Sequence, residues 1–313
     1  MYFFKINKKD QLSPPSLVSL YAIYSTNRSY IFIPTGRLFW NENKMRATIA
    51  TGTIRANNDF DYGENEDEFR LVFSEIRNFV SIDVSRRVVG HFYIGVMYLG
   101  TKTSYKFDQG SQDENDFARE FFKQKGIEDN FVSSIGLDFS FDSRDYPYYP
   151  TKGFSGSIRP KLNAGWLGSE NDYVDTDFEL DYFYSLRQNM ILAMSVSGGF
   201  AFGDVPFDGY QNYGFRNSLR GYETGKYKGR NMIASQAELR WRFYKRLGGV
   251  IFAGTGSVWG NDNEDEFENK WLPSAGAGLR FMVSKEKKIN IRLDYAFGVD
   301  DNQGLYFGVM EAF

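Results

Sequence analysis

Polar and apolar residues alternate one by one along several stretches of the chain. In the stretch 234–243 the two sets are Gln236, Glu238, Arg240 and Arg242 against Ala237, Leu239, Trp241 and Phe243. The stretches 134–142, 174–186 and 289–295 alternate in the same way. Successive side chains of a β-strand point to opposite faces, so this period of two predicts an all-β chain whose strands separate two environments.

The alternation, with the turn residues between stretches, predicts about fourteen strands. Their approximate ranges are 15–25, 28–40, 44–56, 75–87, 90–106, 131–143, 153–166, 173–187, 189–203, 230–244, 248–259, 273–284, 288–298 and 303–313. Many exceed the ~5–6 residues usual in soluble sheets and reach the ~9–11 that a tilted strand needs to cross a bilayer. A soluble sandwich also alternates, but strands of this length favour a transmembrane antiparallel β-barrel.

The connections between the predicted strands are of two kinds. Tight turns fall at 41–43, 88–90, 187–189, 246–248 and 285–287, whereas 57–70, 107–130, 204–229 and 260–272 are long and polar. Short turns at one end and long loops at the other are the layout of a transmembrane barrel. One long loop contains a candidate helix at 113–124. Because no linker or change of composition divides the chain, we expect one domain over 1–313.

The composition supports this interpretation. Aromatic residues make up 18% of the chain, which also has 31 glycines but only 8 prolines, as expected for aromatic strands joined by Gly-rich turns. The mean hydropathy is −0.46, and no window approaches the ~20 apolar residues of a spanning helix. This excludes a helical membrane protein and leaves a barrel open, because alternation hides barrel strands in an average. The 37 basic and 40 acidic residues nearly cancel, which argues against a nucleic-acid partner.

Residues with the chemistry of catalysis or metal binding are scarce. The chain has no cysteine and one histidine, His91, whereas a His-based site usually needs a second imidazole. The acidic loop 261–266 lacks the ligand spacing of a calcium-binding EF-hand, and is better explained as a solvated loop. We therefore expect no metal, no cofactor and no enzymatic activity.

Three segments go beyond a generic barrel pattern. The first is a charged turn, DSRDYPYYPTKG at 142–153, with the candidate residues Asp142, Arg144, Asp145, Pro150 and Gly153. The second is the motif Leu219, Arg220, Gly221 and Tyr222 in the long loop 204–229, followed by a strand that carries Gln236 and Glu238. The third is the aromatic end of the chain, where we expect Phe313 to close a strand and to share a face with Leu305, Phe307 and Val309.

Together these segments resemble the barrel of the bacterial surface antigen superfamily, the BamA/TamA-like outer-membrane assembly factors, over almost the whole chain. The resemblance implies a sixteen-stranded barrel in the bacterial outer membrane that assembles, inserts or translocates proteins. Its expected partners are outer-membrane lipid or lipopolysaccharide and other outer-membrane or periplasmic proteins. Two other functions stay open: a passive pore or uptake channel, and the membrane anchor of a larger protein such as a patatin-like lipase.

The resemblance also bears on the start of the chain. It places the Arg-Gly-Tyr loop between the eleventh and twelfth family strands and implies that this loop folds into the barrel. Counting back from there, we expect the first strand, part of the second and the periplasmic POTRA repeats to be missing here. Tyr2 to Ile6 has the pattern of the tail of a strand, which also favours a truncated start.

Arg220 is the residue to which the resemblance gives the clearest role. In similar proteins its counterpart reaches into the lumen, the interior of the barrel, and pairs with acids of the wall. Glu238 is the best candidate partner, and rivals lie on another strand: Asp175, Asp177, Glu179 and Asp181. Similar proteins often carry a second acid on the strand that follows the one with Glu238, and at that place this chain has Gly254. The alternative is that Arg220 is a solvated loop residue.

The charged turn at 142–153 has two interpretations. Asp142 and Asp145 have the residue types of a paired-carboxylate acid and base. A salt-bridged turn at the membrane interface explains Asp142, Arg144 and Asp145 better.

Overall fold

A single antiparallel sheet dominates the computed structural model. The structure describes residues 1–313 except 25–27, 63–68, 213–218, 223–226, 261–269 and 300–301, and, within strands, except the side chains of 23, 60–62 and 69. Fifteen strands form the sheet in the order β1 to β10 and then β13 to β17. Their bounds are β1 Tyr2–Phe4, β2 Ser16–Tyr24, β3 Tyr30–Trp40, β4 Met45–Tyr62, β5 Phe69–Val89, β6 Phe92–Lys106, β7 Asn130–Asp142, β8 Gly153–Asn163, β9 Tyr173–Arg187, β10 Met190–Gly203, β13 Asn231–Tyr244, β14 Leu247–Trp259, β15 Leu272–Ser284, β16 Ile289–Phe297 and β17 Gln303–Val309.

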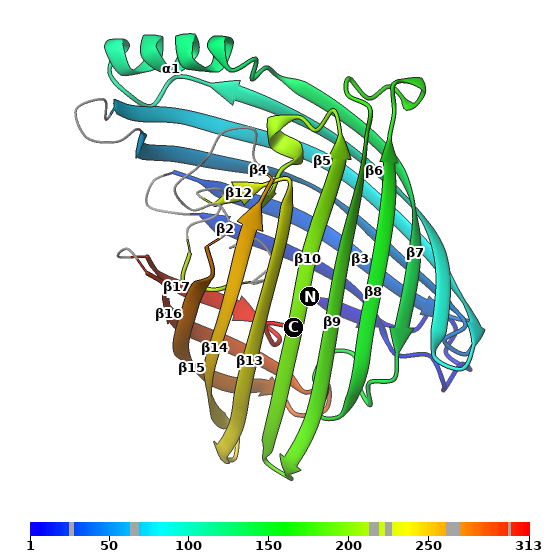
Figure 1. Ribbon diagram of the computed structural model, residues 1–313. Coiled ribbons are helices and arrows are strands. Elements are labelled where there is room, and N and C mark those ends of the chain that lie inside the picture. Colours follow the sequence, from blue (N-terminus) through cyan, green and yellow to red (C-terminus); the bar gives the residue numbers. More distant parts are fainter. Residues whose placement is uncertain (25–27, 63–68, 213–218, 223–226, 261–269, 300–301) are drawn as a thin grey trace.

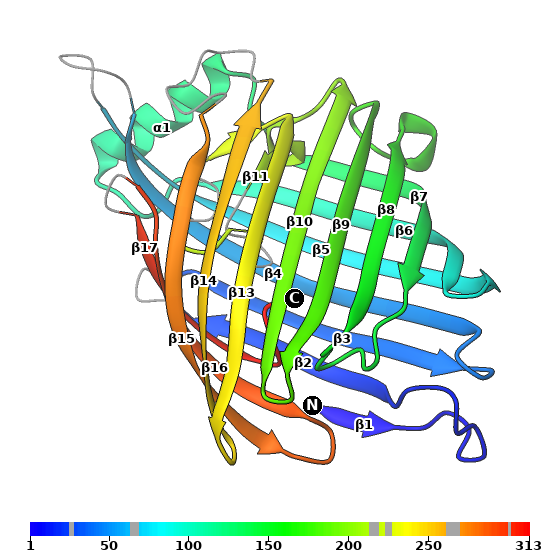
Figure 2. The same cartoon turned by 60° about the horizontal axis from the view of Figure 1, so that its bottom comes forward.

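The sheet grows hairpin by hairpin and curves into a barrel (Figure 1). Figure 2 shows the same wall from another side, with the long connections and the helix gathered at one end. We call that end the loop end, and the opposite one, where short turns join the strands, the turn end. The predicted all-β antiparallel barrel is confirmed, and each of the fourteen predicted strands has a counterpart in the sheet. The fifteenth strand is β1, which pairs with residues 16–18 only.

The alternation along β13 separates the two faces of the wall as predicted. Glu238 is 0% exposed and Arg240 4%, whereas Trp241 is 49% exposed and Phe243 47%. The same holds on neighbouring strands, where the exposed large apolar residues occupy every second position. The polar set faces the lumen and the apolar set forms the outer face, which is the reverse of a soluble sandwich.

Two strands are longer than predicted, so the assignment of 57–70 to a loop is wrong. β4 continues to Tyr62 and β5 begins at Phe69, and the two pair throughout, with Asn57 opposite Ser74 and Asp59 opposite Val72. Polar residues suggested a loop, but a paired ladder satisfies the backbone whatever its side chains are. Polarity therefore marked where the apolar face ends, and not where the strands end.

The remaining elements lie in the long connections. They are α1 Gln112–Gln124, the 3-10 turns η2 Gly165–Leu167 and η3 Phe207–Gly209, and the short pair β11 Gln211–Asn212 and β12 Lys228–Gly229. The predicted helix at 113–124 is confirmed as α1, which begins with a capping box between Ser111 and Glu114. Its Phe122 packs on Leu71 and Phe73 of β5. Among the described residues, no helix is long and apolar enough to cross a membrane.

The two edges of the sheet are not joined by a ladder in the part of the chain that the structure describes. β1 covers only the start of β2, so that residues 19–24 of β2 have a ladder partner on the β3 side alone. β17 pairs with β16 alone. The barrel therefore has a seam between β17 and the β1–β2 edge, at which backbone N–H and C=O groups lack strand partners.

Candidate functional site

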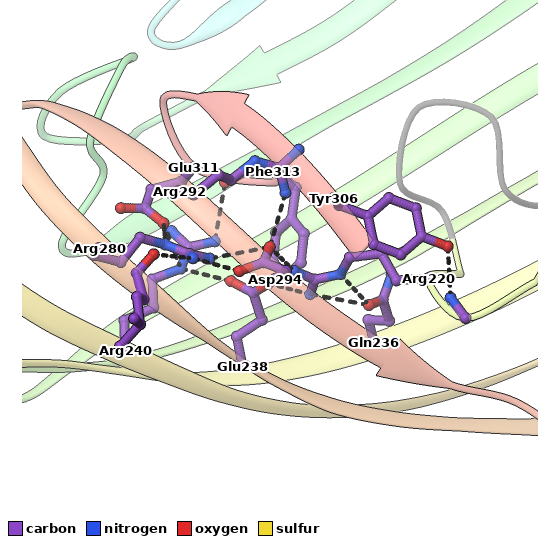
Figure 3. A network of polar contacts seen from close by, with 12 residues as sticks. Arg220, Gln236, Glu238, Arg240, Arg280, Arg292, Asp294, Tyr306, Glu311 and Phe313 are labelled. Atoms are coloured by element: carbon purple, nitrogen blue, oxygen red, sulfur yellow. Dashed lines mark hydrogen bonds and ion pairs between the residues drawn. The ribbon is translucent and has the colours of Figure 1, made fainter. Parts of the chain in front are cut away.

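Arg220 lies at the centre of a buried cluster in the lumen (Figure 3). Its Nη1 donates to Oδ2 of Asp294 on β16 at 2.7 Å, and its Nη2 contacts Glu238 on β13. Oε1 of Gln236 accepts from Nε at 3.1 Å and from Nη2 at 3.0 Å. The guanidinium also stacks 3.6 Å from the ring centre of Phe252. Arg220 and both carboxylates are fully buried, a state that ions tolerate only when they are paired.

The backbone at Arg220 is fixed by the neighbouring strands. Its carbonyl accepts a hydrogen bond from Ser274 of β15, and the N–H of Gly221 donates to the hydroxyl of Tyr306 on β17 at 2.8 Å. Gly221 has φ +106°, and a Cβ there would lie 2.8 Å from the backbone of Phe297. Any other residue would strain the loop and push it off the wall.

Leu219 and Tyr222 hold the loop on either side of Arg220. Leu219 belongs to an apolar cluster with Tyr222, Tyr227, Met232, Ala234, Val258 and Leu272. The Tyr222 hydroxyl donates to the carbonyl of Pro273 and accepts from the N–H of Val299 at 3.3 Å. All four residues of the motif thus contact β13 to β17 or the turn between β16 and β17, next to the seam.

The second carboxylate partner is Asp294, which the sequence did not single out. The resemblance points to β14 for a second acid, where this chain has Gly254, and a Cβ there would lie 3.1 Å from Leu219 and still closer to the backbone of Ser235. Asp294 does belong to the polar face of the alternating stretch 289–295. The alternating pattern places Asp294 on the inner face. It does not show that the loop reaches β16, which is three strands beyond β13 in the sheet.

The rival acids on β9 have a partner of their own. Nζ of Lys161 on β8 lies 2.6 Å from Oδ2 of Asp175 and 2.7 Å from Oδ2 of Asp177. Asp181 accepts from the hydroxyl of Ser155 at 3.1 Å. The carboxylates that contact Arg220 are instead Glu238 and Asp294.

The cluster extends along the wall through four more charged residues, namely Arg240, Arg280, Arg292 and Glu311. Nε of Arg240 donates to Oε2 of Glu238 at 2.7 Å. Arg280 pairs with Asp294 and, through Nε, with Oε2 of Glu311 at 2.8 Å. Arg292 reaches Oδ2 of Asp294 at 3.1 Å. Each of the three carboxylates serves at least two arginines, so removing one carboxylate would leave several buried cations short of a partner.

The position of Phe313 corrects the prediction that it closes the last strand on the same face as Leu305, Phe307 and Val309. β17 ends at Val309, and Met310 adopts φ +75°, which turns the chain away from the outward row. The carbonyl oxygen of Phe313 accepts from Nη2 of Arg240 at 3.1 Å, and its ring lies 6.4 Å from that of Phe183. Alternation along a strand could not predict this, because one left-handed residue ends the period.

The long loop 204–229 is also anchored on the opposite wall. Asp208 accepts from Thr103 of β6 at 2.6 Å and from Asn130 of β7 at 2.9 Å, and its carbonyl accepts from Arg77 of β5 at 3.1 Å. Lys228 lies 3.3 Å from Glu75 of β5. Residues 213–218 and 223–226 of this loop lie outside the described residues. Its described parts contact β5 to β7 on one side and β13 to β17 on the other, and so cross the loop end of the lumen.

Asp142 and Arg144 form a separate charged site at the turn end. Nε and Nη2 of Arg144 donate to the two carboxylate oxygens of Asp142 at 2.9 and 3.1 Å. Nη1 of Arg46 reaches the same carboxylate at 3.0 Å, and Cζ of Arg46 lies 3.8 Å from the ring centre of Tyr93. With two arginines on Asp142, this geometry is that of a salt-bridged turn.

Asp145 holds the rest of that turn in shape. Its carboxylate accepts from the N–H and hydroxyl of Thr151, at 2.8 and 2.6 Å, and from the N–H of Lys152 at 3.3 Å. Burial raises the pKa of Asp145, but these hydrogen bonds outweigh it and hold the pKa below its ordinary value. Pro150 is buried, and Gly153 begins β8 with φ +110°, a conformation that favours glycine.

The tyrosines of the same turn reach across the turn end of the lumen. The hydroxyl of Tyr148 donates to the carbonyl of Pro15 at 2.8 Å, just before β2. Tyr149 packs with Ile191 of β10 and Met282 of β15. Because β2 and β15 are not neighbours of β7 and β8 in the sheet, the segment must lie across the interior.

Among the described residues, no three His, Asp or Glu side chains are grouped so that they could hold a metal ion. His91 lies in the tight turn before β6, with its ring 5.9 Å from that of Phe141.

An antiparallel barrel with an apolar outer face, short turns at one end and a loop folded against its inner wall defines the class of outer-membrane β-barrels. The sequence profile of the Omp85 superfamily domain matches residues 36–313. The chain belongs to this superfamily and is a bacterial outer-membrane barrel, which confirms the resemblance to BamA/TamA-like proteins. No curated protein matches the chain at a significant level.

Several solved structures share the fold at low sequence identity. BamA from Haemophilus ducreyi lacking POTRA domains 1–3 is 16% identical with a TM-score of 0.59, and the match covers 95% of this chain and 64% of that one. CdiB from Acinetobacter baumannii is 12% identical, TM-score 0.61, over 95% of this chain and 53% of the other. CdiB from Escherichia coli is 12% identical, TM-score 0.60, over 98% and 61%. The chain thus spans less than two thirds of the length of these structures.

Proposed function

We propose that this barrel acts on other proteins, inserting them into the outer membrane or passing them across it, and that it is not an enzyme. The observation that carries the proposal is the attachment of the Leu219–Tyr222 motif to the wall beside the seam. The motif contacts β13 to β17, and β17 is the strand that ends the sheet. An edge strand presents unpaired N–H and C=O groups, to which a strand of another chain can add.

The chemistry of the candidate residues supports a positioning role over a catalytic one. Glu238 is shared by Arg220 and Arg240, and Asp142 by Arg46 and Arg144. A carboxylate held by two arginines is a poor general base, because its charge is already stabilised. The partners that this function implies are unfolded outer-membrane or secreted proteins, periplasmic proteins that deliver them, and the lipid around the barrel.

A photoreactive amino acid placed at the seam tests the proposal. Phe307 of β17 and Leu293 of β16 are register partners, and both are exposed on the outer face, but only Phe307 lies on the edge strand. We expect a photoreactive residue at Phe307 to capture an unfolded outer-membrane protein during its insertion, and the same residue at Leu293 to capture several-fold less. Equal capture at both positions would reject a role for the seam.

A further inference from the structure

The outer face carries one lysine whose position is unusual for a surface that contacts lipid. Lys102 lies on β6 in the same outward row as Ile94, Val96 and Tyr98, and its side chain is exposed. Within the described residues, no carboxylate comes within ion-pair distance of its ammonium group. A charged side chain on the lipid face is costly at the bilayer midplane and nearly free of cost at the interface.

The height of Lys102 places it at the interface on the loop side. β6 starts at Phe92 at the turn end, and Lys102 follows ten residues later. A strand rises about 3.3 Å per residue and is tilted by roughly 40°, so these residues span about 25 Å of membrane, the height of the whole apolar band. In this barrel layout the long loops are extracellular, which puts Lys102 among the head groups of the outer leaflet.

The strand register aligns polar groups with Lys102. Thr53, Asn78 and Lys102 are successive ladder partners on β4, β5 and β6, and Phe32 and Phe131 flank them on β3 and β7. The Thr53 hydroxyl donates to Oδ1 of Asn78 at 2.7 Å. This oxygen is therefore occupied, and the amide N–H groups of Asn78, which form no hydrogen bond with the described residues, are left to donate.

A groove runs from this row into the apolar band. Its lining includes Phe32, Pro34, Val80, Tyr98, Phe131 and Lys102. Gly100, the ladder partner of Val80, adds no side chain to the groove, and the hydroxyl of Tyr98 lies 3.2 Å from that of Ser133 beside it. An apolar groove that ends in an ammonium and an amide donor matches an acyl chain below a phosphate.

We propose that this groove binds one phosphate-bearing glycolipid of the outer leaflet, with an acyl chain along Val80 and Tyr98 and a phosphate on Lys102. The site lies on β3 to β7, away from the seam, and it does not depend on the function proposed above. The charge of Lys102, which no carboxylate of the described wall balances, is the feature that selects an anionic head group.

Retention of lipid A by the purified full chain tests the proposal. In native mass spectrometry from detergent, we expect lipid A to stay bound to the unaltered protein and to Lys102→Arg, and Lys102→Gln to bind about fivefold more weakly, the effect of one lysine at a membrane surface. Two matched controls are Lys106→Gln, further along β6 toward the loop end, and Arg86→Gln, exposed on the outer face of β5 near the turn end. Both should bind lipid A as the unaltered protein does.

The other outcomes reject the site. Undiminished binding of lipid A by Lys102→Gln would overturn the proposal, and a protein partner would then be the better candidate for this face. An equal loss in Lys106→Gln would mean that general surface charge attracts the lipid. Displacement of lipid A by millimolar inorganic phosphate would mean that the row binds free phosphate. Heat-modifiable mobility of each variant reports that its barrel is folded.

Discussion

Arg220 illustrates how a buried charge can organise a loop. Its guanidinium meets Glu238, Asp294 and Gln236 and leaves the loop backbone to bond with Ser274 and, through Gly221, with Tyr306. A pair of this kind contributes little net stability compared with an apolar substitute, but it is expensive to break. The cluster therefore specifies one loop position more than it strengthens the barrel.

Removing Arg220 or Glu238 should lower the stability of the barrel. We expect Arg220→Ala and Glu238→Ala each to reduce the thermal midpoint in detergent, and the double variant to be little worse than either, with a coupling of about 1–3 kcal/mol. Arg220→Ala combined with Asp177→Ala serves as the control and should be additive, because Asp177 pairs with Lys161. Additivity of Arg220 with Glu238 would contradict the contact.

At this scale the sequence predicted a part of the cluster. The motif indicated Arg220, and the period of two placed Glu238 on the inner face of the strand that follows. Predicting the contact of Asp294 requires the order of four strands, and predicting that of Glu311 requires the turn at Met310. Neither is a local property of the sequence.

Among the elements, β13 is a strand whose burial follows the alternation of its sequence. Cysteine scanning across 235–243 should give a period-2 pattern of quenching by a lipid-soluble probe, with Leu239, Trp241 and Phe243 quenched. Gln236, Glu238 and Arg240 should be protected, because they face the lumen. Uniform quenching along the stretch would argue against a membrane wall here.

The segment after β17 is held by arginines of the inner wall. Glu311 bonds to Arg280 and lies 3.8 Å from Arg240, which also holds Phe313. We expect Glu311→Gln to lower the thermal midpoint, because Arg280 and Arg240 lose a shared carboxylate in a buried site. Glu286→Gln, in the exposed turn after β15, is the control and should change nothing. A midpoint unaffected by Glu311→Gln would mean that the segment is not held in the lumen in solution.

The lengths of β4 and β5 could not be predicted from the alternation of polar and apolar residues. The strands were found because each has a lipid side and a water side. Beyond the bilayer that contrast disappears, so the outer ends of β4 and β5 looked like a loop although they pair to the last residues described.

For the whole molecule, the long loop and the tyrosine turn lie across the two ends of the lumen. We expect low single-channel conductance for the unaltered protein and larger or more frequent openings for Asp208→Ala, which removes the carboxylate that bonds the loop to Thr103 of β6 and Asn130 of β7. Asp204→Ala, in the same segment but bonded to Asn171 of the loop region, is the control and should stay quiet. A steady current through the unaltered protein, unchanged in Asp208→Ala, would favour a passive pore.

Because one loop is attached to two walls, binding at the seam and binding in the lumen are thermodynamically coupled. If the wall beside the seam shifts, the Arg220 contacts must shift with it, while Asp208 holds the other part of the loop to β5, β6 and β7. A molecule that binds in the lumen by displacing the loop must then change the affinity of the seam for an added strand. A strand added at β17 must change the affinity of the lumen for that molecule by the same factor. Binding measured at either place therefore reports on the other.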